Sequence, residues 1–262
     1  MKLWQHADRI LALAAMLGWL AAYRGFAAPS VPEGLVAYRA VYSVHLDGIG
    51  VGISHLTLKP GPNGLWICHS SAKPNALFGL FDSARLEERS RFRIRDGRLE
   101  DLSYTLVEPG RSARHDQGVQ FDWRDHRVHA YVGSQKKTFP LRTGELDRLT
   151  AQIALSRDLV LRGHPPKVFR VINHNHLHRY RFVANGRRSW RTPLGIFQTV
   201  AYQRRSRKGA TLTFWCAPTL YEIPIVARQT RHGHPTITLH LIGFQRLSST
   251  PINQVLGKVT PR

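Results

Sequence analysis

Residues 38–59 read YRAVYSVHLDGIGVGISHLTLK, and this stretch decides the fold class. From Tyr38 to Leu46 an apolar side chain stands at every second position, which is the repeat of a β-strand. Asp47 and Gly48 then begin a turn, and a second alternating run follows it. Two alternating runs joined by so short a turn predict a β-hairpin.

Alternating runs separated by glycine, proline and asparagine turns continue along most of the chain. Further strands are predicted over residues 65–71, 85–95, 99–108, 112–122, 127–132, 135–141, 167–173, 176–184, 189–192, 195–205, 210–217, 224–231 and 236–247. Short strands at such even spacing are typical of an antiparallel sheet, barrel or sandwich. The sequence therefore predicts a mainly β fold.

One segment departs from the β pattern. Residues 145–161 place leucine and isoleucine side chains near helical spacing, and Gly163 stands just past their end. We expect a helix of about four turns here and a shorter helical turn over residues 75–81. Both would pack an apolar face against the sheet.

The N-terminal residues have the three-part organisation of a secretory signal peptide. Lys2 and Arg9 precede an apolar run over residues 10–22, and small residues lead up to Ala27. The run is shorter than the roughly 20 residues of a membrane-spanning helix. We therefore predict cleavage near Ala27 and a periplasmic protein, with an uncleaved N-terminal anchor as the alternative.

The domain organisation follows from these features. We predict a signal peptide over residues 1–27, a flexible leader over 28–36, a single β domain over 37–248 and a C-terminal tail over 249–262. A chain of this length can bury a substantial core in one domain.

The chain is strongly basic, with 38 lysines and arginines against 17 acidic residues. Such an imbalance favours an anionic partner, which outside the cytoplasm means lipid headgroups or other anionic envelope components, and allows peripheral membrane contact. Nucleic acid is the usual partner of so basic a chain, but the export signal argues against it. The alternative is a basic surface without a function.

Two cysteines, Cys68 and Cys216, remain in the predicted mature protein. An even number of cysteines in an oxidising compartment predicts a disulfide, and two buried free thiols are the alternative. Neither cysteine belongs to a Cys-x-x-Cys pair, so thiol–disulfide catalysis is not expected.

A histidine-rich stretch is a candidate metal site. On a β-strand, His174, His176 and His178 would share one face, and three imidazoles suit zinc, copper or nickel. Neighbours two apart on a strand are about 6.6–7 Å apart, so one ion could bind all three only if the strand bends. A solvated strand is the stronger interpretation, and no cofactor is predicted.

Catalytic motifs are absent from the sequence. It contains no nucleophile elbow, phosphate-binding loop or His-Glu-x-x-His motif, and Glu87 and Glu88 would point to opposite faces of a strand. We therefore predict a non-enzymatic protein. An enzyme that acts on envelope polymers, with paired carboxylates in a cleft, is the remaining alternative.

Aromatic side chains recur on the predicted strands and fit either a packed core or an apolar groove inside a curved sheet. The apolar segment after Pro74 could cover such a groove as a lid. The candidate residues of the groove and lid are Leu77, Phe78, Leu80, Phe81, Trp123 and Trp190.

The order of several short motifs resembles an uncharacterised bacterial family of exported proteins that is known as a domain of unknown function. The motifs are a Tyr-x-x-x-Tyr strand with its hairpin, a Pro-x-x-Leu-Phe-x-Leu-Phe segment, an acidic-basic strand, Phe-Asp-Trp, Thr-Pro-Leu-Gly-x-Phe and Trp-x-Ala-Pro with Ile-Pro-Ile, at residues 38–52, 74–81, 86–92, 121–123, 192–197 and 215–225. The resemblance implies a large antiparallel sheet curled into a spiral or partial barrel, distantly similar to periplasmic lipoprotein carriers and envelope-integrity proteins. It implies no catalytic residue.

The leading hypothesis is a non-enzymatic envelope protein whose curved sheet holds a lipid or another apolar or anionic ligand. A periplasmic metal-binding protein using the histidine-rich strand is the first alternative, and an enzyme on envelope polymers is the second.

Overall fold

The computed structural model describes residues 32–75, 85–110, 112–206 and 209–248. Within these residues the predicted fold class is confirmed, because strands dominate and a single α-helix accompanies them. No helix in this part of the chain is long and apolar enough to cross a membrane.

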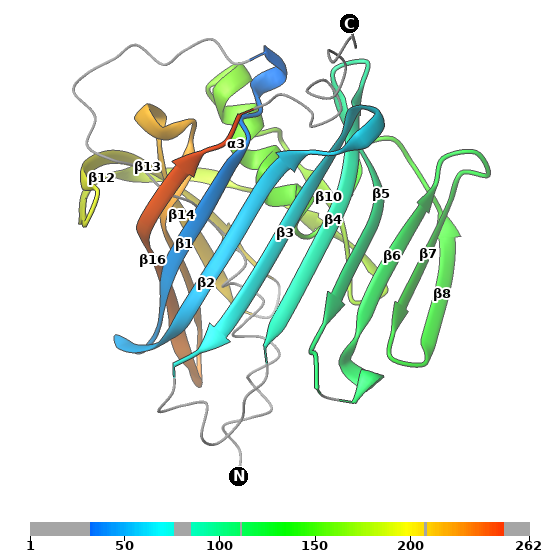
Figure 1. Ribbon diagram of the computed structural model, residues 1–262, viewed down its shortest axis with the longest axis horizontal. Helices are drawn as coiled ribbons and strands as arrows, with labels where there is room; N and C mark the ends of the chain where they lie inside the picture. Colours follow the sequence, from blue (N-terminus) through cyan, green and yellow to red (C-terminus); the bar gives the residue numbers. More distant parts are fainter. Residues whose placement is uncertain (1–31, 76–84, 111, 207–208, 249–262) are drawn as a thin grey trace, which may run out of the picture.

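Thirteen of the described strands form one antiparallel sheet, shown in Figure 1. Its strands, in spatial order, are β12 (Val183–Thr192), β13 (Gly195–Arg205), β14 (Thr211–Ala217), β15 (Ile223–Arg231), β16 (His234–Arg246), β1 (Tyr38–Leu46), β2 (Ile49–Pro60), β3 (Leu65–Pro74), β4 (Leu86–Arg95), β5 (Arg98–Val107), β6 (Gln117–Asp122), β7 (Arg127–Val132) and β8 (Gln135–Pro140). The order ends at β12 on one side and β8 on the other, so the sheet is curved but not closed.

The first and last strands of the sequence join the two halves of this sheet. β1 pairs with β16 on one side and with β2 on the other, so β1 links a meander of β1–β8 to a meander of β12–β16. The predicted alternation of β1 is confirmed, because Tyr38, Ala40, Tyr42 and Val44 are all buried. They belong to the core that lines the concave side of the sheet.

The chain between β8 and β12 forms an inner layer on the concave side. This layer consists of β9 (Glu145–Asp147), α3 (Thr150–Arg162), β10 (Phe169–Asn173) and β11 (His176–Tyr180), with β10 parallel to β9 and antiparallel to β11. In Figure 1, α3 and β10 lie behind β1–β5. Leu149 and Leu155 of this layer are almost fully buried, so side chains rather than an open tunnel fill the centre.

Short 3-10 turns complete the described structure: η2 (Pro32–Gly34), η3 (Pro62–Gly64), η4 (Ala113–His115) and η5 (Pro218–Leu220). Just after η2, Leu35 and Val36 are buried, so the packed chain begins slightly before the predicted domain boundary at residue 37. The short helical turn predicted over residues 75–81 lies almost wholly outside the described residues.

The predicted helix begins later than expected. Residues 145–147 form β9, because Glu145 pairs with Arg170 of β10 in register, and α3 starts only at Thr150. The predicted end is confirmed: Gly163 adopts a left-handed φ of 73° and its N–H donates to the Leu159 carbonyl. The predicted strand over residues 176–184 is likewise divided, into β11 and the start of β12.

The predicted disulfide is not formed, because Cys68 and Cys216 are both free and buried. Cys68 lies on β3 and Cys216 on β14, and four strands of the sheet separate β3 from β14. The charged neighbours of Cys68 are Asp147, Glu88 and Asp101, whereas that of Cys216 is Glu222, so the two thiols lie in different parts of the core.

We predict that both thiols are protected only by the fold. Burial raises the pKa of Cys68 and of Cys216 well above the ordinary value, so neither thiol of the native protein should react with a thiol reagent at neutral pH. After denaturation without reductant, two thiols per chain should be titrated. Denatured protein that yields none would show that the cysteines are bridged.

Candidate functional site

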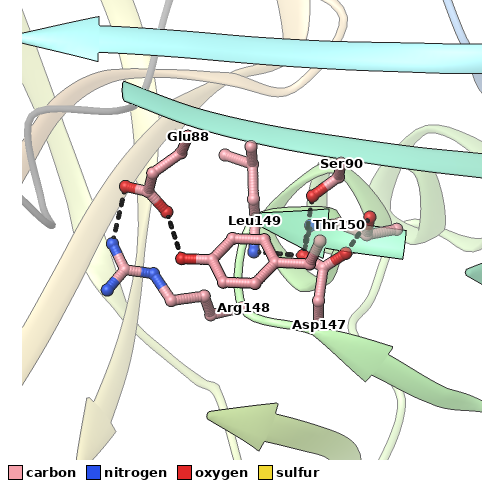
Figure 2. Close-up of polar contacts among 7 residues, drawn as sticks. Glu88, Ser90, Asp147, Arg148, Leu149 and Thr150 are labelled. Carbon is pink, nitrogen blue, oxygen red and sulfur yellow. Dashed lines mark hydrogen bonds and ion pairs between the residues drawn. The ribbon is translucent and has the colours of Figure 1, made fainter. Parts of the chain in front are cut away.

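A buried polar cluster fastens the inner layer to the large sheet (Figure 2). Leu86, Glu88, Ser90 and Phe92 of β4 alternate along the strand and point to the concave side, where all four are buried. The strand period therefore places two polar side chains, Glu88 and Ser90, in the interior. Both meet residues next to the start of α3.

Glu88 forms a buried ion pair with Arg148. The Arg148 guanidinium donates to Glu88 Oε1 at 2.7 Å, and the Tyr104 hydroxyl donates to Glu88 Oε2 at 2.8 Å. Burial raises the pKa of Glu88, and the charge of Arg148 acts in the opposite direction. The pair thus neutralises Arg148 within the protein.

Asp147 holds the first turn of α3. Its Oδ1 atom accepts from the backbone N–H groups of Leu149 and Thr150, at 2.7 and 2.8 Å, and from the Ser90 hydroxyl at 2.9 Å. The Thr150 hydroxyl donates to Oδ2. One carboxylate therefore caps the helix and also ties it to β4.

Asp101 of β5 lies beside Asp147 and completes the cluster. Both side chains have no exposed surface, and Asp101 Oδ2 accepts from the Asp147 backbone N–H. Burial, and then the charge of Asp147, raise the pKa of Asp101 well above the ordinary range of a carboxylic acid. The like charge of Asp147 therefore favours the protonated form of Asp101.

This pair of carboxyl groups does not have the geometry of an active site. A catalytic carboxylate must come within hydrogen-bond reach of a substrate, whereas Asp101 and Asp147 are sealed from solvent and engaged with Ser90, Thr150 and the backbone. The pair is a structural joint between β4, β5, β9 and α3.

A cavity of about 120 Å³ lies next to this joint, between the inner layer and β13–β15. Its apolar wall consists of Ala151, Phe182, Leu212 and Phe214, and its polar lining consists of Arg148, Gln152, Asn173, Tyr180, Arg204 and Gln229. We call it the Arg204 cavity. A second cavity, of about 10 Å³, lies between α3 and β1–β2.

Three residues of the Arg204 cavity carry buried polar atoms without a hydrogen-bond partner. They are the amide oxygens of Gln152 and Asn173 and the Nε atom of Arg204. Buried polar atoms are normally satisfied, so three such residues around one cavity mark a polar site that water or a ligand can fill.

The Arg204 cation differs from Arg148 because no carboxylate pairs with it in the described part of the chain. Its guanidinium lies 3.8 Å from the centre of the Tyr180 ring, which holds it in place without neutralising it. Burial lowers the pKa of Arg204. An arginine remains protonated at neutral pH even so, and it therefore presents an uncompensated positive charge to the cavity.

Comparison with known families decides the classification. The profile of a family described as "Protein of unknown function (DUF3108)" matches residues 41–240. The chain belongs to the DUF3108 family. This result confirms the resemblance to a family of unknown function. No protein with a curated description matches the sequence.

Solved structures resemble this DUF3108 protein in fold. A β-barrel-like DUF1849 protein from Brucella abortus matches with a TM-score of 0.53 and 10% identity, over 82% of this chain and 99% of that one. The MucA/MucB complex of Pseudomonas aeruginosa matches with a TM-score of 0.36 and 8% identity, over 86% of this chain and 57% of that one. A candidate lipoprotein from Parabacteroides distasonis matches with a TM-score of 0.35 and 7% identity, over 87% of this chain and 99% of that one. The first of these supports the β-barrel-like fold.

The histidine-rich stretch of the DUF3108 chain does not have the predicted arrangement. His174 lies in the turn between β10 and β11, with a φ of 49°, so the expectation that it shares a strand face with His176 and His178 is wrong. The rings of His176 and His178 are 6.4 Å apart. In the described residues, no three His, Cys, Asp or Glu side chains lie close enough to hold a metal ion.

The predicted groove and lid residues lie apart from the Arg204 cavity or outside the described structure. Leu77, Phe78, Leu80 and Phe81 belong to the segment that is not described. The Trp123 indole donates to the Asp101 carbonyl at 2.6 Å and is partly buried against the core. Trp190 packs against Trp215 and His240 instead. Neither tryptophan is among the residues that line the cavity.

The sequence analysis did not identify the residues that line the Arg204 cavity. Arg148, Asn173 and Arg204 come from separate elements, and no local motif links them. A usable signal existed for Asp147 alone: it stands three residues before the first residue of α3, and aspartate is a typical capping residue near the start of a helix.

Asp147 should be a principal determinant of stability. We predict that Asp147→Ala lowers the free energy of unfolding by about 3 kcal/mol, because it leaves the buried donors of Ser90, Leu149 and Thr150 unpaired. Chemical denaturation measures this loss. Asp158→Ala is the matched control on α3, since it removes a partly exposed ion pair with Arg162 and should cost less than about 1 kcal/mol. Equal losses would contradict the role assigned to Asp147.

Because the Glu222 carboxyl group is largely buried, we predict that the free energy of unfolding depends on pH in a specific way. Burial raises its pKa to about 7, and its Oε2 atom is buried without a partner. Between the ordinary carboxyl pKa and pH 7 the folded state therefore binds more protons than the unfolded state, and stability falls as pH rises through this window.

Glu222→Gln removes this titration. We expect wild type and variant to be similarly stable near pH 4.5, and the variant to be more stable at pH 8 by roughly 1–3 kcal/mol. Denaturation curves at both pH values test this. A difference that is the same at both pH values would contradict the assignment.

Proposed function

We propose that this protein is a non-enzymatic binding protein of the cell envelope that holds a small anionic ligand in the Arg204 cavity. The observation that carries the proposal is the uncompensated Arg204 cation beside the unpaired amide oxygens of Gln152 and Asn173. Leaving such groups unpaired costs stability, and a ligand that pairs with them recovers that cost.

The chemistry of the lining defines the ligand class. A guanidinium favours a carboxylate or a phosphate, which it binds through two parallel hydrogen bonds. The side-chain amides of Gln152 and Asn173 can each pair with a hydroxyl group. Phe182, Leu212 and Phe214 offer an apolar wall to a short carbon chain. The expected ligand is therefore a hydroxylated organic anion with a small apolar part.

The volume of the cavity narrows the earlier hypothesis of a lipid ligand. About 120 Å³ is well below the roughly 300–1,000 Å³ of pockets that enclose a drug-sized molecule. A headgroup with its first carbon atoms, or a free small anion, fits the available space, whereas a whole lipid does not. A location in the envelope is supported by the signal-like N-terminal residues. A binding role without catalysis is supported by the sealed state of the Asp101–Asp147 pair.

Titration calorimetry with four anions tests this function: inorganic phosphate against glycerol phosphate, and butyrate against hydroxybutyrate. We expect the hydroxylated member of each pair to bind more tightly. Arg204→Gln should weaken binding by about tenfold or more, because hydrogen bonds to a charged group contribute roughly 1.5–3 kcal/mol. Arg205→Gln is the matched control, because the neighbouring side chain on the same strand points away and is exposed.

Two results would contradict the proposal. One is the absence of binding for all four anions at millimolar concentration, and the other is an affinity that is the same in wild type and Arg204→Gln.

A further inference from the structure

The positive charge of the chain is concentrated in its C-terminal part. Residues 159–262 contain 17 lysines and arginines and a single acidic residue, Glu222. Residues 1–158 contain 21 basic and 16 acidic residues. The last 104 residues therefore supply +16 of the net charge of +21. The described part of this range includes the inner strands β10–β11 and the strands β12–β16 of the large sheet.

The edge strand β12 displays this charge on an exposed face. Arg187, Ser189 and Arg191 alternate along β12 and share one side of it, and all three are exposed. Arg191 pairs in register with Ile196 of β13. No carboxylate forms an ion pair with either arginine in the described part of the chain. We call Arg187, Arg191 and Ile196 the hairpin face.

An exposed aliphatic side chain accompanies these arginines. Ile196 is 60% exposed, whereas Val183, which is 51% exposed, pairs with Gln203 and lies on the opposite face of the hairpin. Edge strands often carry charges that prevent pairing with another sheet, and this explains the arginines. Protection of the edge does not explain Ile196, because an exposed isoleucine would favour pairing with another sheet rather than prevent it. Exposed apolar groups beside unpaired cations are typical of a surface that meets an anionic lipid interface.

The opposite side of the hairpin is fixed to the body of the protein. The Trp190 ring packs against Trp215 and His240, with ring centres 5.4 and 5.8 Å apart, and the Arg188 guanidinium lies 4.1 Å from the centre of the Trp190 ring. This packing presents the hairpin face outward. It also occupies the aromatic rings that could otherwise stack on nucleic-acid bases, so lipid is the better partner.

We propose that the β12–β13 hairpin docks this protein on an anionic membrane surface. Arg187 and Arg191 bind lipid phosphates, Ile196 enters the interface between headgroups and acyl chains, and the charge of the C-terminal half attracts the protein to the membrane. This surface is separate from the Arg204 cavity, because neither arginine nor Ile196 lines that cavity.

Sedimentation with vesicles tests the proposal. The protein should bind vesicles that contain phosphatidylglycerol and should not bind vesicles of phosphatidylcholine alone. The double variant Arg187→Gln, Arg191→Gln should bind about 30-fold more weakly, which corresponds to two contacts of ~1 kcal/mol each. Ile196→Ser should weaken binding by about fivefold through loss of apolar contact. Thermal unfolding of each variant should match wild type, because the three side chains are exposed.

The opposite edge of the sheet provides a control of equal charge. Lys136 and Lys137 of β8 are exposed, and Lys136→Gln, Lys137→Gln removes the same two charges. This variant should retain most of the binding. If both double variants bound vesicles equally weakly, net charge alone would explain the binding, and the proposal would be overturned. So would undiminished binding of Ile196→Ser, or equal binding to both kinds of vesicle. Binding of a poly-glutamate peptide without vesicle binding would assign the hairpin face to an acidic protein and also overturn it.

Discussion

The joint formed by Asp147 is the contact on which the rest of the structure depends. Its carboxylate ties Ser90 of β4 to the first amides of α3, while its backbone N–H binds Asp101 of β5. A curved sheet alone would leave its concave side open to water. Because Asp147 fixes the inner layer there, the centre fills with side chains, and the space that remains beside α3 has a defined shape.

The Arg204 cavity follows from this arrangement. Arg148 and Gln152 lie immediately before and within the first turn of α3, so the joint that positions the helix also positions them. Arg148 is neutralised by Glu88, whereas Arg204, from the facing part of the sheet, has no acidic partner in the described residues. The contrast between two arginines of one cavity is the physical basis for proposing an anionic ligand. The hairpin face, at the sheet edge, would place that cavity near a source of such ligands.

Local sequence pattern predicted the strands well and the site poorly. The alternation from Tyr38 to Leu46 and the end of the helix at Gly163 are encoded by neighbouring residues, and both were confirmed. β9 was missed because three residues became a strand only by pairing with β10, which is a tertiary effect. His174 was misplaced because an Asn-His-Asn sequence tolerates the left-handed turn that it forms. The cavity joins residues that are far apart in sequence, so no periodicity could have revealed it.

Hydrogen exchange of the native protein tests the central claim most directly. If Asp147 locks the inner layer to the sheet, the amides of Leu149 and Thr150 and the following turn of α3 should exchange as slowly as those of β4 and β5, by global unfolding. Rapid exchange of this helix while β4 and β5 remain protected would show that the inner layer detaches on its own, and would contradict the account.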